Sequence, residues 1–486
     1  MRSLLLAALS LFFAAPAQAA PINVDGGLVQ GEAHDGSLLF RGIPFAAPPV
    51  GELRWKPPQP VRPWRGVRES LVQPASCLQN DDGWNHSDFV IGNEDCLTLD
   101  VRTPALSGKL PVVVWIHGGS NRVGGPNDIV LSDLGKQVVI VGVRYRLGIL
   151  GFLSHRELTT EQGASGNYGL MDQIAALRWV QRNIAKFGGD PGNVTIAGES
   201  AGGQDVSLLL AAPSARPLFA KAIMQSGSPG FGMPFRPLGE AERIGDQAAD
   251  LLAPGTNLAK MRGASPAALL AVDRQLFAAK TPGNSFIWLR TTIDGSVLPA
   301  DPAKLLKDAP AKPVIVGSNR YEWDIPGGRS YRDQFVADSF GANERRGRTF
   351  YKLDGPVSAD DPRLGSTLGQ IATDVTFRCP AFRIAEIMAT KGAPVWQYDF
   401  DGAANGARSF HSAEIAYAFG DSKLANGLSL KPYWVNFIRS GDPNGPGLAA
   451  WPRFTPQQPL HALISVSGVT AEAPFHAPAC ALLDTL

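Results

Sequence analysis

The chain has 486 residues, of which 44% are hydrophobic, which is enough for a large core and excludes a disordered, collagen-like or coiled-coil protein. Its 45 lysines and arginines nearly balance 44 aspartates and glutamates, so neither nucleic acid nor another polyanion is an expected partner. A rule of about 150 residues per domain suggests three domains, but this rule overcounts the domains of α/β enzymes that are built on a single sheet.

The first 19 residues have the pattern of a secretory signal peptide. Arg2 gives a positive start, residues 4–15 are apolar, and Ala17-Gln18-Ala19 has the small residues of a cleavage site. The apolar stretch is shorter than the roughly 20 residues that span a bilayer. We therefore expect residues 20–486 to form one domain, exported to the periplasm or secreted, without stable membrane insertion and with its oligomeric state left open.

If the protein is exported, its four cysteines are expected to form disulfides, because disulfides persist in oxidising compartments. Three pairings are possible. Pairing Cys77 with Cys96 closes a short loop and leaves Cys379 with Cys480. In the chain-entropy model these two bridges would stabilise the fold by roughly 3 and 4.7 kcal/mol. The alternative is that one or more of the cysteines are free buried thiols.

The first half of the chain predicts an excursion followed by two buried strands. Residues 40–63, rich in proline and glycine, are expected to pass over the sheet as an ordered segment. Residues 111–116 (PVVVWI) and 138–143 (VVIVGV) are short β-branched runs, typical of strands that are buried on both faces.

Helical and strand patterns then alternate. Residues 172–187 carry apolar side chains at helical spacing and end at two glycines, residues 194–197 predict a strand, and residues 206–211 predict a helix. Residues 229–310 are helical and irregular, as expected of a cap-like insertion. This order predicts an α/β fold with a mostly parallel central sheet flanked by helices.

The strongest functional motif is Gly198-Glu199-Ser200-Ala201-Gly202, a G-x-S-x-G pattern between a predicted strand and a predicted helix. In that context the small residues permit a strained turn that lifts the serine hydroxyl above the sheet. The N–H groups at the start of the helix favour a developing anion. We expect Ser200 to be a nucleophile rather than a structural turn serine.

Acyl transfer also needs hydrogen-bond donors for the oxyanion. His117-Gly118-Gly119 directly follows the predicted strand 111–116, and glycines let the backbone approach a substrate closely. The alternative is a plain glycine turn. The expected donors are the backbone N–H groups of Gly118, Gly119 and Ala201.

A nucleophilic serine needs a base and an orienting carboxylate, in the chain order serine, acid, histidine. Three histidines follow Ser200 far enough to leave room for an acid between them: His411, His461 and His476. The first lies in a polar turn that opens a helix, whereas His461 lies in a strand-like apolar run and His476 among prolines. His411 is therefore the predicted base.

The acid is expected just past the carboxyl end of a strand, where sites in such sheets collect. Residues 314–322 have the pattern of a strand that ends in a loop, and Glu322 lies just past the carboxyl end of the strand. Asp324 is the nearby competitor, and Glu322 is the residue that we favour.

At this point the sequence is identified as resembling the type-B carboxylesterases, the cholinesterase-like branch of the α/β-hydrolases, as a secreted bacterial-type member. The resemblance extends over nearly all of the chain after the signal peptide. It is carried by residues 40–60, 94–101, 143–153, 166–200, 222–228, 411–420 and 433–444. It implies an α/β-hydrolase fold with cap-like insertions and the hydrolysis of small-molecule carboxylic esters.

The resemblance also implies residue roles in a two-step mechanism that uses no metal or cofactor. It places the nucleophile, acid and base on Ser200, Glu322 and His411. For the mechanism we also expect Glu199 and Ser226 to support His411 and Glu322. The same three oxyanion donors follow from it. The first disulfide of the family matches Cys77 and Cys96, and a later one matches Cys379 and Cys480 less closely.

Three departures from the family pattern put the shape of the pocket in question. Ser120-Asn121 replaces an extra glycine and an aromatic, Arg144 replaces an asparagine, and Gln204-Asp205 replaces small residues after the nucleophile. None of them removes a catalytic group.

Aromatic residues supply candidates for the substrate pocket. Trp84 lies inside the loop between Cys77 and Cys96, where cholinesterases stack a quaternary ammonium on an aromatic face. We favour the simpler interpretation, an apolar wall or packing residue, and do not predict choline esters. Phe286 and Trp288 are the wall candidates in the insertion.

Two other functions remain open at this point. One is a non-catalytic binding protein on the same scaffold, although all three expected catalytic residues are present. The other keeps the site but changes the bond from an ester to an amide, a lactone or a carbamate.

Overall fold

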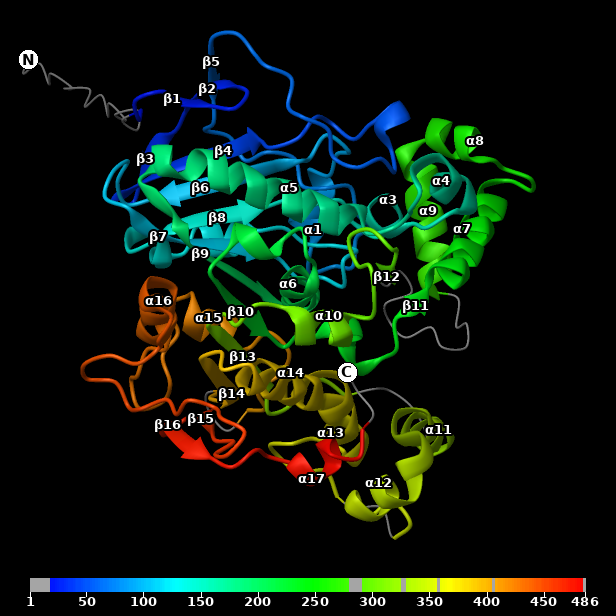
Figure 1. Cartoon of the computed structure of the whole chain (residues 1–486), viewed down its shortest axis with the longest axis vertical. Helices are drawn as coiled ribbons and strands as arrows, with labels where there is room; N and C mark the ends of the chain where they lie inside the picture. Colours follow the sequence, from blue (N-terminus) through cyan, green and yellow to red (C-terminus); the bar gives the residue numbers. More distant parts are fainter. Residues whose placement is uncertain (1–17, 279–290, 325–328, 356–358, 404–406, 484–486) are drawn as a thin grey trace, which may run out of the picture.

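The computed structural model describes residues 18–278, 291–324, 329–355, 359–403 and 407–483. Its main sheet has the strand order β16-β15-β14-β13-β10-β9-β7-β8-β6-β4-β3 (Figure 1). The strands of this sheet are β3 (Glu32–His34), β4 (Ser37–Pro44), β6 (Thr98–Thr103), β7 (Leu110–Ile116), β8 (Val139–Val143), β9 (Gly189–Glu199), β10 (Lys221–Gln225), β13 (Val314–Asn319), β14 (Val395–Asp401), β15 (His461–Ser465) and β16 (Gly468–Glu472). Two small sheets contain β1 (Ile22–Val24), β2 (Gly27–Gln30) and β5 (Val67–Glu69), and β11 (Arg236–Pro237) and β12 (Thr292–Ile293).

The centre of the main sheet is parallel, from β8 through β15, and both edges are antiparallel. The expected α/β-hydrolase fold is confirmed. The expectation for residues 40–63 is wrong at its start, because Phe40–Pro44 belong to β4 and pair with β6. Antiparallel neighbours need no crossover helix, so the strand–helix alternation that indicated the centre gave no sign of this edge.

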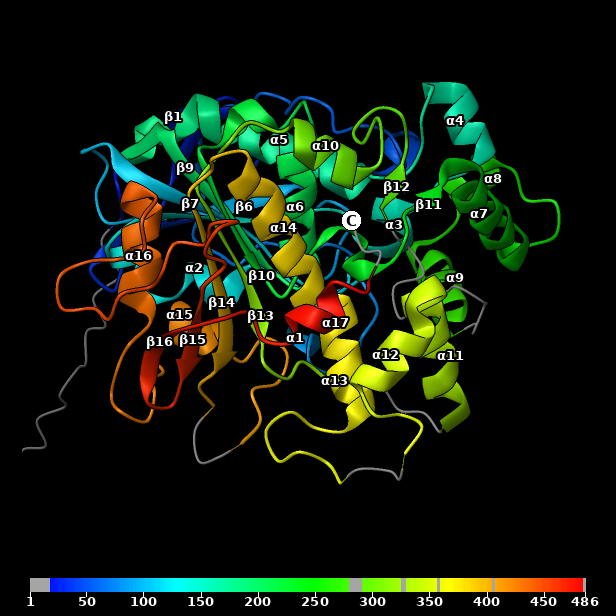
Figure 2. The same ribbon diagram turned by 60° about the horizontal axis from the view of Figure 1, so that its bottom comes forward.

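Helices cover both faces of the sheet, as Figure 2 shows from the side of the C-terminal half. One layer contains α5 (Tyr168–Asn183), α6 (Ala201–Ala211), α10 (Pro302–Asp308) and α14 (Cys379–Thr390). The other contains α2 (Asn127–Val130), α15 (Ile415–Ala418) and α16 (Lys431–Ser440). Along β7, Val112 and Val114 pack into the first core and Val113 and Trp115 into the second, which explains the unbroken apolar run.

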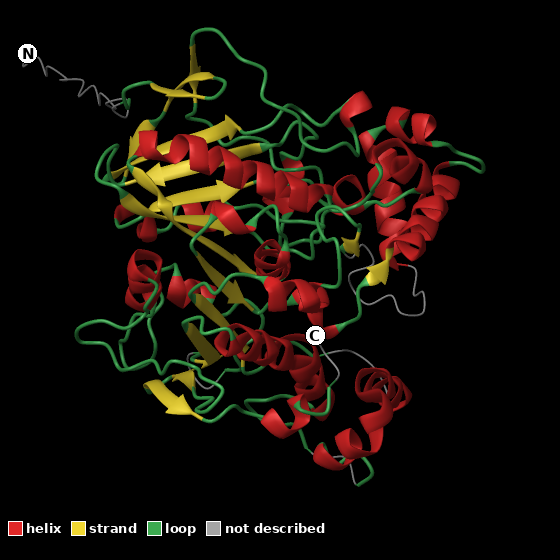
Figure 3. Cartoon of the chain, in the orientation of Figure 1, coloured by secondary structure: helices red, strands yellow, loops and turns green. Residues whose placement is uncertain are grey.

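The remaining helices form two groups beyond the strand ends (Figures 1 and 3). The first contains α3 (Gly148–Phe152), α4 (Arg156–Gln162), α7 (Leu238–Leu252), α8 (Leu258–Gly263) and α9 (Pro266–Ala278). A further short helix, α1 (His86–Val90), lies in the loop between Cys77 and Cys96. The second contains α11 (Arg329–Phe340), α12 (Glu344–Phe350), α13 (Thr367–Thr373) and α17 (Ala477–Cys480). None of the helices in the described ranges is long and apolar enough to cross a membrane.

Both expected disulfides are present. Cys77 is bonded to Cys96 and Cys379 to Cys480, with Cα atoms 4.9 Å apart in each pair. The alternative of free buried thiols is therefore wrong. The second bridge fastens α17, near the C-terminal end, to the start of α14.

Candidate active site

Ser200 lies on the sharp turn between β9 and α6. Its φ of 56° and ψ of −126° are rarely adopted by residues with a side chain, so the turn is held under backbone strain. Its N–H donates to the carbonyl of Gln225 on the neighbouring strand at 2.9 Å. A Cβ atom at Gly202 would lie 2.1 Å from the carbonyl oxygen of Ile116, so only glycine lets α6 begin this close to β7.

His411 connects the serine to a carboxylate. Its Nε2 lies 2.8 Å from Ser200 Oγ, and its Nδ1 lies 2.7 Å from Glu322 Oε2. The backbone N–H of His411 also donates to the carbonyl of Glu322 at 2.7 Å, which fixes the two loops together. The three residues follow β9, β13 and β14, whose carboxyl ends meet at one edge of the parallel sheet.

Both carboxylate oxygens of Glu322, which is 1% exposed, are occupied. The second oxygen, Oε1, accepts hydrogen bonds from the Ser226 hydroxyl and the Asn319 N–H, each at 2.7 Å. The competing acid, Asp324, is exposed and accepts a hydrogen bond from the Ser366 hydroxyl at 2.6 Å. The geometry therefore favours Glu322 over Asp324 as the partner of His411.

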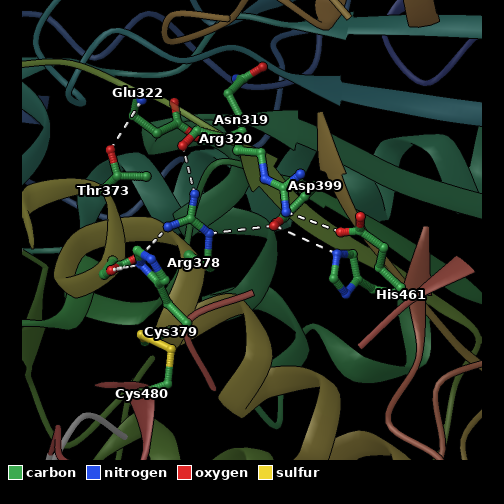
Figure 4. Close-up of polar contacts among 12 residues, drawn as sticks. Asn319, Arg320, Glu322, Thr373, Arg378, Cys379, Asp399, His461 and Cys480 are labelled. Atoms are coloured by element: carbon green, nitrogen blue, oxygen red, sulfur yellow. Dashed lines mark hydrogen bonds and ion pairs between the residues drawn. A yellow bond between two sulfur atoms is a disulfide. The ribbon is translucent and has the colours of Figure 1, made fainter. Parts of the chain in front are cut away.

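A buried arginine supports the loop that carries Glu322 (Figure 4). Arg378 donates to the carbonyl of Arg320 at 2.7 Å, and the N–H of Glu322 donates to the Thr373 hydroxyl at 3.2 Å. Arg378 also forms ion pairs with Asp374 and Asp399, two buried carboxylates. The loop that carries Glu322 is thus held by Arg378, the residue just before α14, whose charge is balanced by Asp374 and by Asp399 on β14.

The two histidines that the sequence analysis set aside lie in this charged cluster. The Nε2 atom of His461 is 3.7 Å from Asp399 Oδ2 (Figure 4). His476 Nδ1 is 2.6 Å from Asp374 Oδ2. Both are therefore engaged away from Ser200, whereas His411 is within hydrogen-bond distance of it.

Negative charge dominates the surroundings of His411. Burial alone would lower its pKa, but the charges on Glu199, Glu322 and Glu414, together with the hydrogen bond to Glu322, raise the pKa to about 9. Glu199 Oε1 lies 3.3 Å from His411 Nε2 and accepts the Ser412 hydroxyl at 2.6 Å. Burial, together with the charges on Glu199 and Glu322, raises the pKa of Glu414 to about 7.

This charge arrangement predicts a pH dependence. A general base must be neutral, so kcat/KM is expected to rise with pH as His411 loses its proton. Glu199→Gln removes the largest of the charges that raise this pKa, and a charge at such a distance is worth about one unit or more. The midpoint of the kcat/KM profile should move to lower pH by about that amount. Glu386→Gln changes a partly exposed carboxylate on α14 that pairs with Arg383, so it should leave the midpoint in place. Equal midpoints for the unmodified enzyme and both variants would contradict the view that Glu199 raises the pKa of His411.

The structure describes the backbone at each of the three expected oxyanion donors. A Cβ atom at Gly118 would lie 3.0 Å from Ser200 Cβ, so this backbone is in contact with the nucleophile. Gly119 has a φ of 99°, and a Cβ atom there would lie 2.0 Å from the carbonyl oxygen of Val123. Ala201 is the first residue of α6, where N–H groups lack intrahelical partners. Their role as donors stays a prediction.

Aromatic residues that the sequence analysis missed line this site. Phe231 and Phe377 pack with Ala201 in a small buried cluster against which Trp323 also packs. The ring centroids of Trp323 and Phe377 lie 4.7 and 5.1 Å from that of His411. Trp323 directly follows Glu322 in the sequence, and this position next to the predicted acid could have identified it as a residue of the site. Together they form an apolar cluster next to Ala201 and His411, and Trp323 is its partly exposed member.

Of the expected pocket aromatics, Phe286 and Trp288 lie outside the described residues. Trp84 is 67% exposed. A Cβ atom at Gly124 would lie 3.4 Å from its ring and 2.9 Å from the carbonyl oxygen of Gly118. Trp84 therefore borders the loop that carries Gly118, and its contact with substrate stays a prediction.

Comparison with known proteins agrees with this geometry. The sequence model of the carboxylesterase family matches residues 18–482. Carboxylesterase 1D of Rattus norvegicus is 36% identical, and the match covers 86% of this chain and 83% of that protein. Cocaine esterase of Homo sapiens is 34% identical, with 88% and 83% covered. Among solved structures, a PNB esterase superposes with a TM-score of 0.81 at 30% identity, covering 95% of this chain and 99% of that one. The carboxylesterase EST55 of Geobacillus stearothermophilus gives a TM-score of 0.81 at 28% identity, with 96% and 100% covered.

Proposed function

The chain belongs to the carboxylesterase family and is a carboxylic ester hydrolase, and we propose that it acts through Ser200, His411 and Glu322 by way of an acyl-enzyme. The observation that carries this proposal is the continuous chain of hydrogen bonds from Ser200 Oγ through both ring nitrogens of His411 to Glu322. This is the arrangement in which a serine is activated by a base that a carboxylate orients.

The proposed reaction has two steps. Ser200 Oγ attacks the ester carbonyl carbon while His411 Nε2 takes the hydroxyl proton, and Glu322 stabilises the imidazolium that results. The carbonyl oxygen, now negative, accepts hydrogen bonds from the N–H groups of Gly118, Gly119 and Ala201. His411 returns the proton to the leaving alcohol. Water then hydrolyses the acyl-enzyme by the same route, so no metal or cofactor takes part in the proposed mechanism.

The site suits a small-molecule ester with an apolar portion. Trp323, which is partly exposed beside His411, offers that portion an apolar surface, and the buried rings of Phe231 and Phe377 pack behind it. Two further side chains support the catalytic residues. Ser226 donates a hydrogen bond to Glu322, and Glu199 lies beside His411.

We also propose that the protein is exported, with residues 1–19 as a signal peptide and residues 20–486 as one domain, secreted or periplasmic. Two disulfides support an oxidising compartment. The likeness to an esterase of Geobacillus stearothermophilus supports a bacterial-type member of the family.

The first test is to label the mature protein with a fluorophosphonate and to locate the adduct by peptide mass mapping. We expect one adduct per chain on Ser200, and none in the His411→Ala variant, because the hydroxyl is then no longer activated. An adduct on another residue, or unlabelled Ser200 in folded protein, would overturn the proposal. A panel of p-nitrophenyl esters and matching anilides separates ester from amide hydrolysis.

A further inference from the structure

Two of the three departures from the family pattern meet in the structure. Asn121, two residues after Gly119, donates from Nδ2 to Asp205 Oδ1 at 3.0 Å. Asp205 lies on α6, five residues after Ser200. Both side chains are buried, with exposed fractions of 2% for Asn121 and 0% for Asp205. The hydrogen bond therefore connects the predicted oxyanion loop with the helix that begins at the nucleophile.

The backbone of the loop needs support at this point. Ser120 and Asn121 both have positive φ angles, 57° and 55°, a conformation that glycine adopts freely and that asparagine tolerates better than most residues. The carbonyl of Asn121 accepts the N–H of Gly148 at 2.7 Å. The hydroxyl of Tyr145 lies 3.1 Å from Asn121 Oδ1 and 2.7 Å from the carbonyl oxygen of His117. Asn121 is thus held through its backbone and through both ends of its amide.

Asp205 is held from two sides by neutral groups. Its second oxygen, Oδ2, accepts a hydrogen bond from Gln173 Nε2 on α5 at 2.6 Å. Within the described ranges, its hydrogen-bond donors are amides, and burial raises the pKa of this carboxyl to about 7. Burying a carboxyl group costs free energy, and no cation is among the described donors to Asp205 that offset this cost. We therefore expect the two acceptor oxygens of Asp205 to serve a specific purpose.

We propose that Asp205 is a positioning residue: through Asn121 it holds the segment that carries Gly118 and Gly119 in a fixed place relative to Ser200. The inference rests on the proposed function and deepens it. Oxyanion donors act on charge that develops only in the transition state, so a displaced loop lowers kcat more than it changes KM.

The test is a set of variants at both ends of the hydrogen bond. Asp205→Ala is expected to lower kcat at least about tenfold, with KM kept, which is less than the 10²–10³-fold cost of a lost donor. Asp205→Asn should keep kcat near that of the unmodified enzyme, because its amide oxygen still accepts from Asn121 and Gln173 can turn its own amide to match. Asn121→Ala should lower kcat to the same degree as Asp205→Ala, and the double variant should be no slower than either single one.

Gln173→Ala is the matched control. It removes the hydrogen bond at the other oxygen of the same carboxylate, so it should lower Tm comparably while leaving kcat within about threefold of that of the unmodified enzyme. If Asp205→Ala and Gln173→Ala lower kcat equally, Asp205 has only a structural role and the inference is overturned. Should Asp205→Ala not fold, Asn121→Ala decides the matter against the same control. Failure of the proposed function would appear differently, as an unlabelled Ser200 in the unmodified enzyme.

Discussion

Replacing Ser200 with alanine is expected to lower kcat by about 10⁵–10⁶-fold and to abolish the burst of alcohol released in the first turnover. Without Oγ no acyl-enzyme can form, and His411 would have to activate water directly. The turn itself should survive, since alanine differs from serine only by the lost hydroxyl and the strained backbone is set by Gly202 and the bond to Gln225. Single-turnover kinetics with a p-nitrophenyl ester measure both quantities.

The matched control for this variant is Ser207→Ala. Ser207 is a buried serine of α6 whose hydroxyl donates to the carbonyl of Gln204 at 2.5 Å. It should retain a full burst. If Ser200→Ala still releases a full burst of alcohol, the nucleophile is another residue and the proposed mechanism is wrong.

The sequence predicted the centre of the sheet better than its edges. Strands β7 and β8 are β-branched runs buried on two faces, and that pattern is strong in a short window. By contrast, β4 contains Arg41, Gly42 and Pro44, residues typical of an excursion, and its pairing with β6 depends on a segment more than fifty residues away. A long-range antiparallel pairing of this kind leaves no local signal.

The candidate site divides in the same way. Ser200 was predicted from contiguous residues, because the motif, the strand and the helix all lie within one window. Glu322 and His411 followed from their order and position along the chain. The buried cluster of Phe231 and Phe377 was missed, since these rings lie far apart in the sequence and meet only once α6 and the chain before α14 are placed.

The bond between Asn121 and Asp205 is a further case. Each residue stood out in the sequence as a departure from the family pattern, 84 positions apart. Their contact depends on where the loop after β7 lies relative to α6, which the sequence does not state. Only the structure shows that two separate substitutions form one hydrogen bond.

The second large effect is expected for Glu322→Gln, which should lower kcat by about 10⁴-fold. Two N–H or O–H donors, from Asn319 and Ser226, face the Oε1 position, so the new amide oxygen should stay there and its NH₂ group should turn toward His411 Nδ1. A donor at that place selects the tautomer with its proton on Nε2. That nitrogen could then no longer accept the proton of Ser200.

Asp324→Asn is the matched control, because it changes the competing acid two residues away in the same manner. Its carboxylate binds Ser366, not His411, so kcat should stay within about twofold. Since the loss in Glu322→Gln comes from the tautomer and not from a shifted titration, raising the pH should not restore activity. The reverse outcome, a slow Asp324→Asn and a fast Glu322→Gln, would assign the acid to Asp324. A profile that only moves to lower pH, with kcat kept at its plateau, would instead show that Glu322 acts only through its charge, because that charge raises the pKa of His411.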